Sequence, residues 1–83
     1  MLRREIWVDG RGRVTRYNLA YINHEIYAGD NGRVLGYDSA HGRHHRHCKG
    51  QVTVIRHEGF AQIEARFQRE WDRLVKEARR AEN

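Results

Sequence analysis

The spacing of apolar residues changes near residue 58, and this change constrains the fold more than any other feature of the chain. From Phe60 onward, apolar side chains recur three or four residues apart, as on one face of an amphipathic helix. The members of this stripe are Phe60, Ile63, Phe67, Trp71, Leu74 and Ala78. Because the chain contains no proline, the spacing predicts an uninterrupted helix from about Gly59 to Ala81.

Before residue 58 the sequence predicts strands that are joined by turns. Runs rich in β-branched and aromatic residues alternate there with turns that contain glycine. The expected strands are residues 6–8, 13–28, 33–38, 43–48 and 51–57. With 83 residues the chain makes one domain, 1–83, in which residues 1–57 form the sheet and residues 58–83 form the helix. We therefore expect an α+β fold: a meander of about five antiparallel strands followed by one long C-terminal amphipathic helix packed on one face.

Two glycine-containing turns set the expected strand register. A two-residue loop at residues 10–11 places Glu5 opposite Arg16. The same loop places Trp7 opposite Val14, and we expect Trp7 to pack near the end of the sheet.

The second turn is Asn31-Gly32, a pair that suits a type I′ hairpin loop because both residues tolerate positive φ. This loop places Ile26 opposite Tyr37, which is a favourable apolar pair. It also places Glu25 opposite Asp38, and two like charges in that position repel each other. Either a nearby cation compensates this pair, or the register is shifted.

Positive charge is concentrated in the first two thirds of the chain. Residues 1–57 hold ten Lys/Arg, five Asp/Glu and all six histidines, whereas residues 58–83 hold six basic and six acidic residues. A basic surface attracts polyanions, most often nucleic acid and next an acidic protein. No apolar run approaches the ~18–20 residues of a membrane span, and the start has no apolar signal region. The lone Cys48 fits a reducing compartment, so we expect a cytoplasmic protein without membrane contact.

The residue types that support chemistry are concentrated between Asp38 and Cys48. This stretch contains Asp38, His41, Arg43, His44, His45, Arg46, His47 and Cys48. On a strand, His45 and His47 point to one face and His44 points to the other. The sequence contains no Walker-type loop, no CxxC pair and no nucleophile elbow, so we expect this stretch to carry any activity.

Three interpretations of this stretch stay open. In the first, histidines act as base and acid in the cleavage of RNA, arginines bind the phosphate, and neither a metal nor another cofactor is needed. In the second, the histidines and Cys48 bind a metal such as zinc, although one local cluster differs from the usual paired ligand spacing. In the third, the stretch binds phosphates without chemistry. For the first interpretation the catalytic candidates are His41, His44, His45 and His47, with Asp38 as the orienting carboxylate. The substrate-binding candidates are Arg33, Tyr37, Arg43, Arg46 and Lys49.

Residues 36–47, with the sequence GYDSAHGRHHRH, resemble the signature of the TumE-like toxins. In that family a tyrosine-aspartate-asparagine-alanine run precedes a histidine-histidine-lysine-histidine run. The matching positions here are Tyr37, Asp38, His44, His45 and His47. The chain departs from the signature at Ser39, in a shorter segment without proline before His44, and at Cys48.

The resemblance implies the toxin component of a toxin–antitoxin module that acts on RNA or translation, with a helix-turn-helix antitoxin as partner. The alternatives are a nucleic-acid-binding or regulatory module without catalysis and a small His/Cys metal-binding protein. A helix of ~30 Å is also long for so small a sheet. We therefore expect its last turns, with Trp71, Leu74 and Ala78, to overhang the sheet, where they would meet a second copy in a homodimer.

Overall fold

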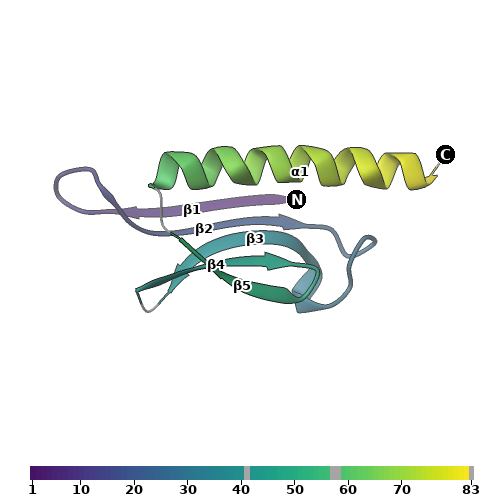
Figure 1. The fold of residues 1–83 in the computed structure, drawn as a ribbon, viewed down its shortest axis with the longest axis horizontal. Coiled ribbons are helices and arrows are strands. Elements are labelled where there is room, and N and C mark those ends of the chain that lie inside the picture. Colours follow the sequence, from purple (N-terminus) through teal and green to yellow (C-terminus); the bar gives the residue numbers. More distant parts are fainter. Residues whose placement is uncertain (41, 57–58, 83) are drawn as a thin grey trace.

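The computed structural model describes residues 1–40, 42–56 and 59–82, in which five antiparallel strands precede one long helix (Figure 1). The strands are β1 (Leu2–Val8), β2 (Val14–Ile22), β3 (Arg33–Ala40), β4 (Arg43–Cys48) and β5 (Gln51–Ile55). Helix α1 covers Phe60–Glu82. The strand order is β1-β2-β3-β4-β5, so strands that follow each other in the chain are paired in the sheet. The predicted α+β meander with a C-terminal helix is confirmed.

Helix α1 packs on β2 and β3 through its apolar stripe, from which Ile63, Phe67 and Leu74 are buried. The buried sheet residues of this core include Tyr17, Leu19, Tyr21, Leu35 and Tyr37. Figure 1 shows the helix running along one side of the twisted sheet. We call the side that α1 covers the helix face, and the opposite side, which no described helix covers, the open face.

The loop between β1 and β2 is longer than the predicted two-residue turn. Asp9 closes it: its backbone amide donates to the carbonyl of Arg13 at 2.9 Å, and its carboxylate accepts from the Arg13 amide at 3.0 Å. Because five residues separate the two strands, the register moves by two positions. Trp7 pairs with Arg16, so the predicted pairing of Trp7 with Val14 is wrong.

This shift changes the surroundings of Trp7. The side chain is 42% exposed on the open face instead of packed, and Cζ of Arg16 lies 4.7 Å from the centroid of its ring. Glu5 pairs with Asn18 rather than with the predicted Arg16.

The predicted hairpin at Asn31-Gly32 is wrong as well. Strand β2 ends at Ile22, and the connection to β3 includes a 3₁₀ turn over Asp30–Gly32, in which Asn31 has a φ of 54°. The observed β2 partners are Leu19 for Tyr37 and Asn18 for Asp38, in place of Ile26 and Glu25. The observed register avoids the repulsion between the two carboxylates, which is the physical reason against the predicted one.

The middle of α1 is held within the chain. Leu74 is 7% exposed, and Trp71 packs edge-on against Tyr21 with ring centroids 6.5 Å apart. The last turns of the helix extend past the strands in Figure 1. Leu74 thus belongs to the intramolecular core and the partly buried Trp71 packs against it, and the homodimer stays a prediction.

Candidate functional site

Asp38 is the centre of a polar cluster on the open face. It is the direct cross-strand partner of His45, and Oδ1 of Asp38 lies 3.4 Å from Nδ1 of His45. His47, two residues further along β4, places Nε2 2.9 Å from Oδ2 of Asp38. Arg33 places Nη1 3.5 Å from the same oxygen. We call Arg33, Asp38, His45 and His47 the open-face cluster.

Arg33 reaches this cluster by lying across Gly36. A Cβ on Gly36 would stand 2.7 Å from Cδ of Arg33, so the missing side chain makes room for the arginine. Nε of Arg33 donates to Oδ2 of Asp30 at 2.8 Å, and Nη2 lies 3.0 Å from Nδ1 of His47. The guanidinium is therefore fixed between the 3₁₀ turn and the open face.

These contacts determine the hydrogen-bonding role of each ring nitrogen in His47. Because a guanidinium only donates, Nδ1 of His47 accepts from Arg33, and Nε2 carries the proton that it donates to Asp38. Both nitrogens of His47 are thus engaged. In His45 only Nδ1 has a partner, and Nε2 has none among the described residues. The His45 side chain is 22% exposed, and Nε2 is the one imidazole nitrogen of the open-face cluster without a partner among the described residues.

A second polar cluster joins the sheet to the helix. Nε of Arg46 lies 3.1 Å from each carboxylate oxygen of Glu70, and the hydroxyl of the buried Tyr37 donates to Glu70 as well. Burial, followed by the hydrogen bond to Glu70, raises the pKa of Tyr37 to about 12. Burial alone would raise the pKa of Glu70, but the bonds from Arg46 and Tyr37 outweigh it and lower that pKa below its usual value.

His44 also lies on the helix face, where it contacts Tyr17. Its Nδ1 is 2.8 Å from the Tyr17 hydroxyl, and the two rings stack with centroids 5.6 Å apart. Burial, followed by the charge of Asp38, raises the pKa of Tyr17 to about 12, so the hydroxyl keeps its proton at neutral pH. Ser39 accepts from the backbone amide of Tyr17 at 3.0 Å.

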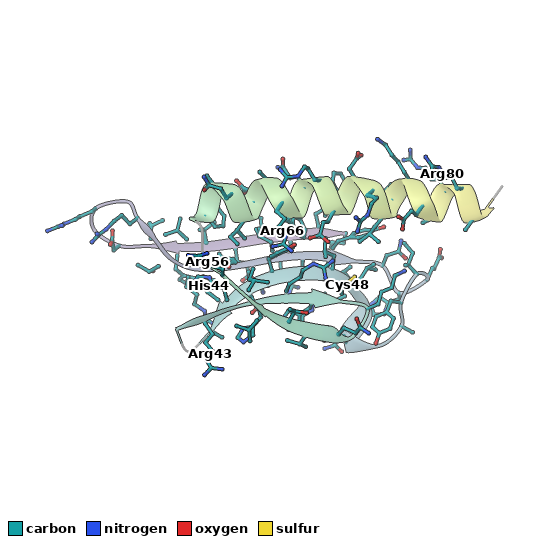
Figure 2. All side chains as sticks on the ribbon, in the orientation of Figure 1. Arg43, His44, Cys48, Arg56, Arg66 and Arg80 are labelled. Atoms are coloured by element: carbon teal, nitrogen blue, oxygen red, sulfur yellow. The ribbon has the colours of Figure 1, made fainter. Side chains whose placement is uncertain are left out.

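The predicted site residues are therefore divided between the two faces. Arg33, Asp38, His45 and His47 meet on the open face, whereas Tyr37, His44 and Arg46 lie on the helix face. Arg43 is exposed at the start of β4 and points away from α1 (Figure 2), and Lys49 is exposed in the turn after β4. His41 lies outside the described residues.

Sequence reasoning missed Glu70, Asp30 and Gly36. Glu70 had a signal, because it stands three residues after Phe67 and four before Leu74, on the apolar stripe itself. A carboxylate at such a position needs a buried cation or donor. Asp30 and Gly36 matter because they position the side chain of Arg33. No local sequence pattern specifies where that side chain lies.

Among residues 1–40, 42–56 and 59–82, no group of three or more His, Cys, Asp or Glu side chains is arranged to hold a metal ion. Within the same residues, the helix is not apolar enough to cross a membrane. Comparison with models of protein families, with curated proteins and with solved structures found no match to this chain.

Proposed function

We propose that this protein cleaves RNA without a metal ion, with His45 as the base and Asp38 as the residue that orients it. The observation that carries the proposal is the contact between Asp38 and Nδ1 of His45, which leaves Nε2 as an acceptor on the open face. A carboxylate beside one imidazole nitrogen favours the tautomer in which that nitrogen carries the proton and the other nitrogen can accept one.

The reaction would use the ribose 2′-hydroxyl as nucleophile. Nε2 of His45 takes the hydroxyl proton, the 2′-oxygen bonds to the adjacent phosphorus, and the bond from phosphorus to the 5′-oxygen breaks. Water gives a proton to the leaving 5′-oxygen, and His45 later returns its own proton to solvent. The products are a 2′,3′-cyclic phosphate and a 5′-hydroxyl end. Arg43, on the same face and two residues before His45, supplies positive charge for the phosphorane.

The biological setting of the proposal comes from the sequence. The excess of basic residues in 1–57 suits an RNA substrate. The resemblance of residues 36–47 to the TumE-like toxins supports a toxin of a toxin–antitoxin module, acting in the cytoplasm and neutralised by a helix-turn-helix antitoxin. Co-purification of the chain with the protein encoded beside it is the test of that partner.

The central experiment compares histidine variants in a cleavage assay on single-stranded RNA. We expect His45→Ala to lower the cleavage rate on the order of 10²–10⁴-fold. His24→Ala, an exposed histidine outside the open-face cluster, is the control and should cleave normally. A chelator should not change the rate, and RNA with 2′-deoxy substitution should resist cleavage.

Two results would redirect the proposal. If a folded His44→Ala variant lost as much activity as His45→Ala, the reaction would belong on the helix face. If a chelator abolished cleavage and zinc restored it, a metal site would replace the mechanism given above.

One observation favours a second function, the binding of nucleic acid without catalysis. Both oxygens of Asp38 and both ring nitrogens of His47 have partners within the open-face cluster, as in a network that only stiffens a binding surface. Binding of RNA by the wild-type chain without any cleavage would favour this function.

A further inference from the structure

Trp7 and Arg16 form a stacked pair on the open face, beside the row of residues that contains His45. Arg16 lies over the indole at 4.7 Å, and Trp7 remains 42% exposed. Burying an indole is strongly favourable, so a large ring left in water on an open sheet is a feature to explain. Unpaired bases stack both on aromatic rings and on guanidinium planes, and this pair offers both.

The register places this pair at a fixed distance from the open-face cluster. Glu5, Asn18, Asp38, His45 and Val54 are successive cross-strand partners and form one row across the sheet. Trp7 and Arg16 form the adjacent row, and Arg43 stands two residues before His45 in β4. With ~4.8 Å between strands and ~3.4 Å per residue, Trp7 lies roughly 16 Å from His45. An extended strand of a few nucleotides spans that distance.

The charges along this path fit a phosphate backbone. Neither Arg16 nor Arg43 has a carboxylate partner among the described residues, whereas Arg3 lies 3.9 Å from Glu5. Two unneutralised guanidinium groups thus lie on the same face as the exposed indole and the available nitrogen of His45. A double helix keeps its bases paired and cannot offer one to the indole, so the arrangement selects single strands.

We propose that the open face is a platform for single-stranded RNA, on which an unpaired base stacks on the Trp7–Arg16 pair a few nucleotides from the phosphate that lies at His45. The position of that phosphate rests on the proposed function. The platform itself is a claim about binding, and it is tested without cleavage.

The test measures binding of a labelled single-stranded 2′-O-methyl oligonucleotide, which has no 2′-hydroxyl proton and cannot be cleaved. We expect Trp7→Ala to weaken binding on the order of 10-fold and Trp7→Phe to restore most of it. Val8→Ala, an exposed apolar neighbour in the same strand, is the matched control and should bind normally. The same oligonucleotide in a duplex should bind more weakly than the single strand.

A second readout reports stacking directly. In a Trp71→Phe background, Trp7 is the one tryptophan of the chain, and its emission should be quenched when the oligonucleotide binds. Binding by Trp7→Ala that equals wild type, tighter binding of the duplex, or no binding of the single strand would each overturn the platform. If binding depends on Trp7 but His45→Ala cleaves RNA as wild type does, the platform stands and the proposed catalytic role of His45 fails.

Discussion

The side chain of Arg33 crosses the strand over Gly36, where a Cβ would stand 2.7 Å from the Cδ of the arginine. This crossing carries the guanidinium from Asp30 to His47 in β4, so the missing side chain of Gly36 sets the position of Arg33.

Gly36→Ala should therefore disturb the open-face cluster more than the fold. The new methyl group displaces Arg33, while alanine in a strand loses less backbone entropy than glycine on folding. We expect an unfolding temperature close to that of wild type and a clear loss of RNA cleavage. Gly10→Ala, where a Cβ would have no described atom within 4 Å, is the control and should change neither. Unchanged cleavage by Gly36→Ala would mean that Arg33 plays no part in the site.

Glu70→Gln should destabilise the protein at neutral pH but less so in acid. Glutamine keeps the shape of the side chain but loses the charge that Arg46 faces. We expect this change to lower the free energy of unfolding at neutral pH by about 1–3 kcal/mol. The folded pKa of Glu70 lies below its usual value of 4.5, so its contribution is present above pH 4.5 and is lost as the pH falls further. Urea unfolding of both proteins at neutral and acid pH measures the difference. A gap between the two proteins that stays constant down to low pH would contradict this assignment.

The Tyr37→Phe variant should lose less stability at alkaline pH than the wild type does. The tyrosine pKa rises from its usual 10.0 to about 12 in the folded protein, so the stability that it contributes is complete below pH 10 and is lost between pH 10 and 12. Tyr17, with a pKa also near 12, keeps part of this dependence in the variant. Stability measured across that range should fall less steeply in Tyr37→Phe than in wild type, and Tyr27→Phe serves as the control outside both clusters.

RNA binding should weaken with salt, and Arg43 should account for part of the slope. Each phosphate that a cation neutralises on a single strand contributes about 0.7 to the slope of log affinity against log salt. Arg43→Gln should lower the slope by about that amount. Arg80 lies on the side of α1 that is turned away from the sheet (Figure 2), so Arg80→Gln should leave the slope unchanged. Equal slopes for the two variants would remove Arg43 from the RNA-binding surface.

Leu74→Ala should lower stability by about 2–5 kcal/mol, because its side chain is buried against the sheet of the same chain. If its contacts are all intramolecular, the loss should not depend on protein concentration. A midpoint of unfolding that rises with concentration in wild type and not in the variant would instead place Leu74 in a dimer interface.

The sequence predicts the elements of this fold well because their patterns are local. The stripe that starts at Phe60 specifies the helix, and the alternation along β4 separates His44 from His45 and His47. Both predicted hairpin registers were wrong, because glycine positions alone do not decide the length of a turn. The Asp9 carboxylate enlarges the first loop, and the repulsion between Glu25 and Asp38 argues against the second.

The candidate site is less predictable than the elements. The sequence brings the histidines, arginines and Asp38 close together along the chain, but it does not show which of them meet. Tyr37 and Arg46 are engaged by Glu70, which lies at least 24 residues away in the chain. Such pairings depend on where the helix lies on the sheet, and no spacing in the sequence specifies that.

The meander topology also has a consequence for how the chain folds as it is synthesised. Every strand pairs with a strand next to it in the sequence, so the sheet forms through successive hairpins with little loop entropy to overcome. Helix α1 is made after the whole sheet, and until it arrives the aromatic side chains of β2 and β3 face water. A chain that stops before residue 60 therefore contains the whole open-face cluster but lacks the cover of its core. Such truncated chains should aggregate instead of acting on RNA, which ties the proposed activity to the synthesis of α1.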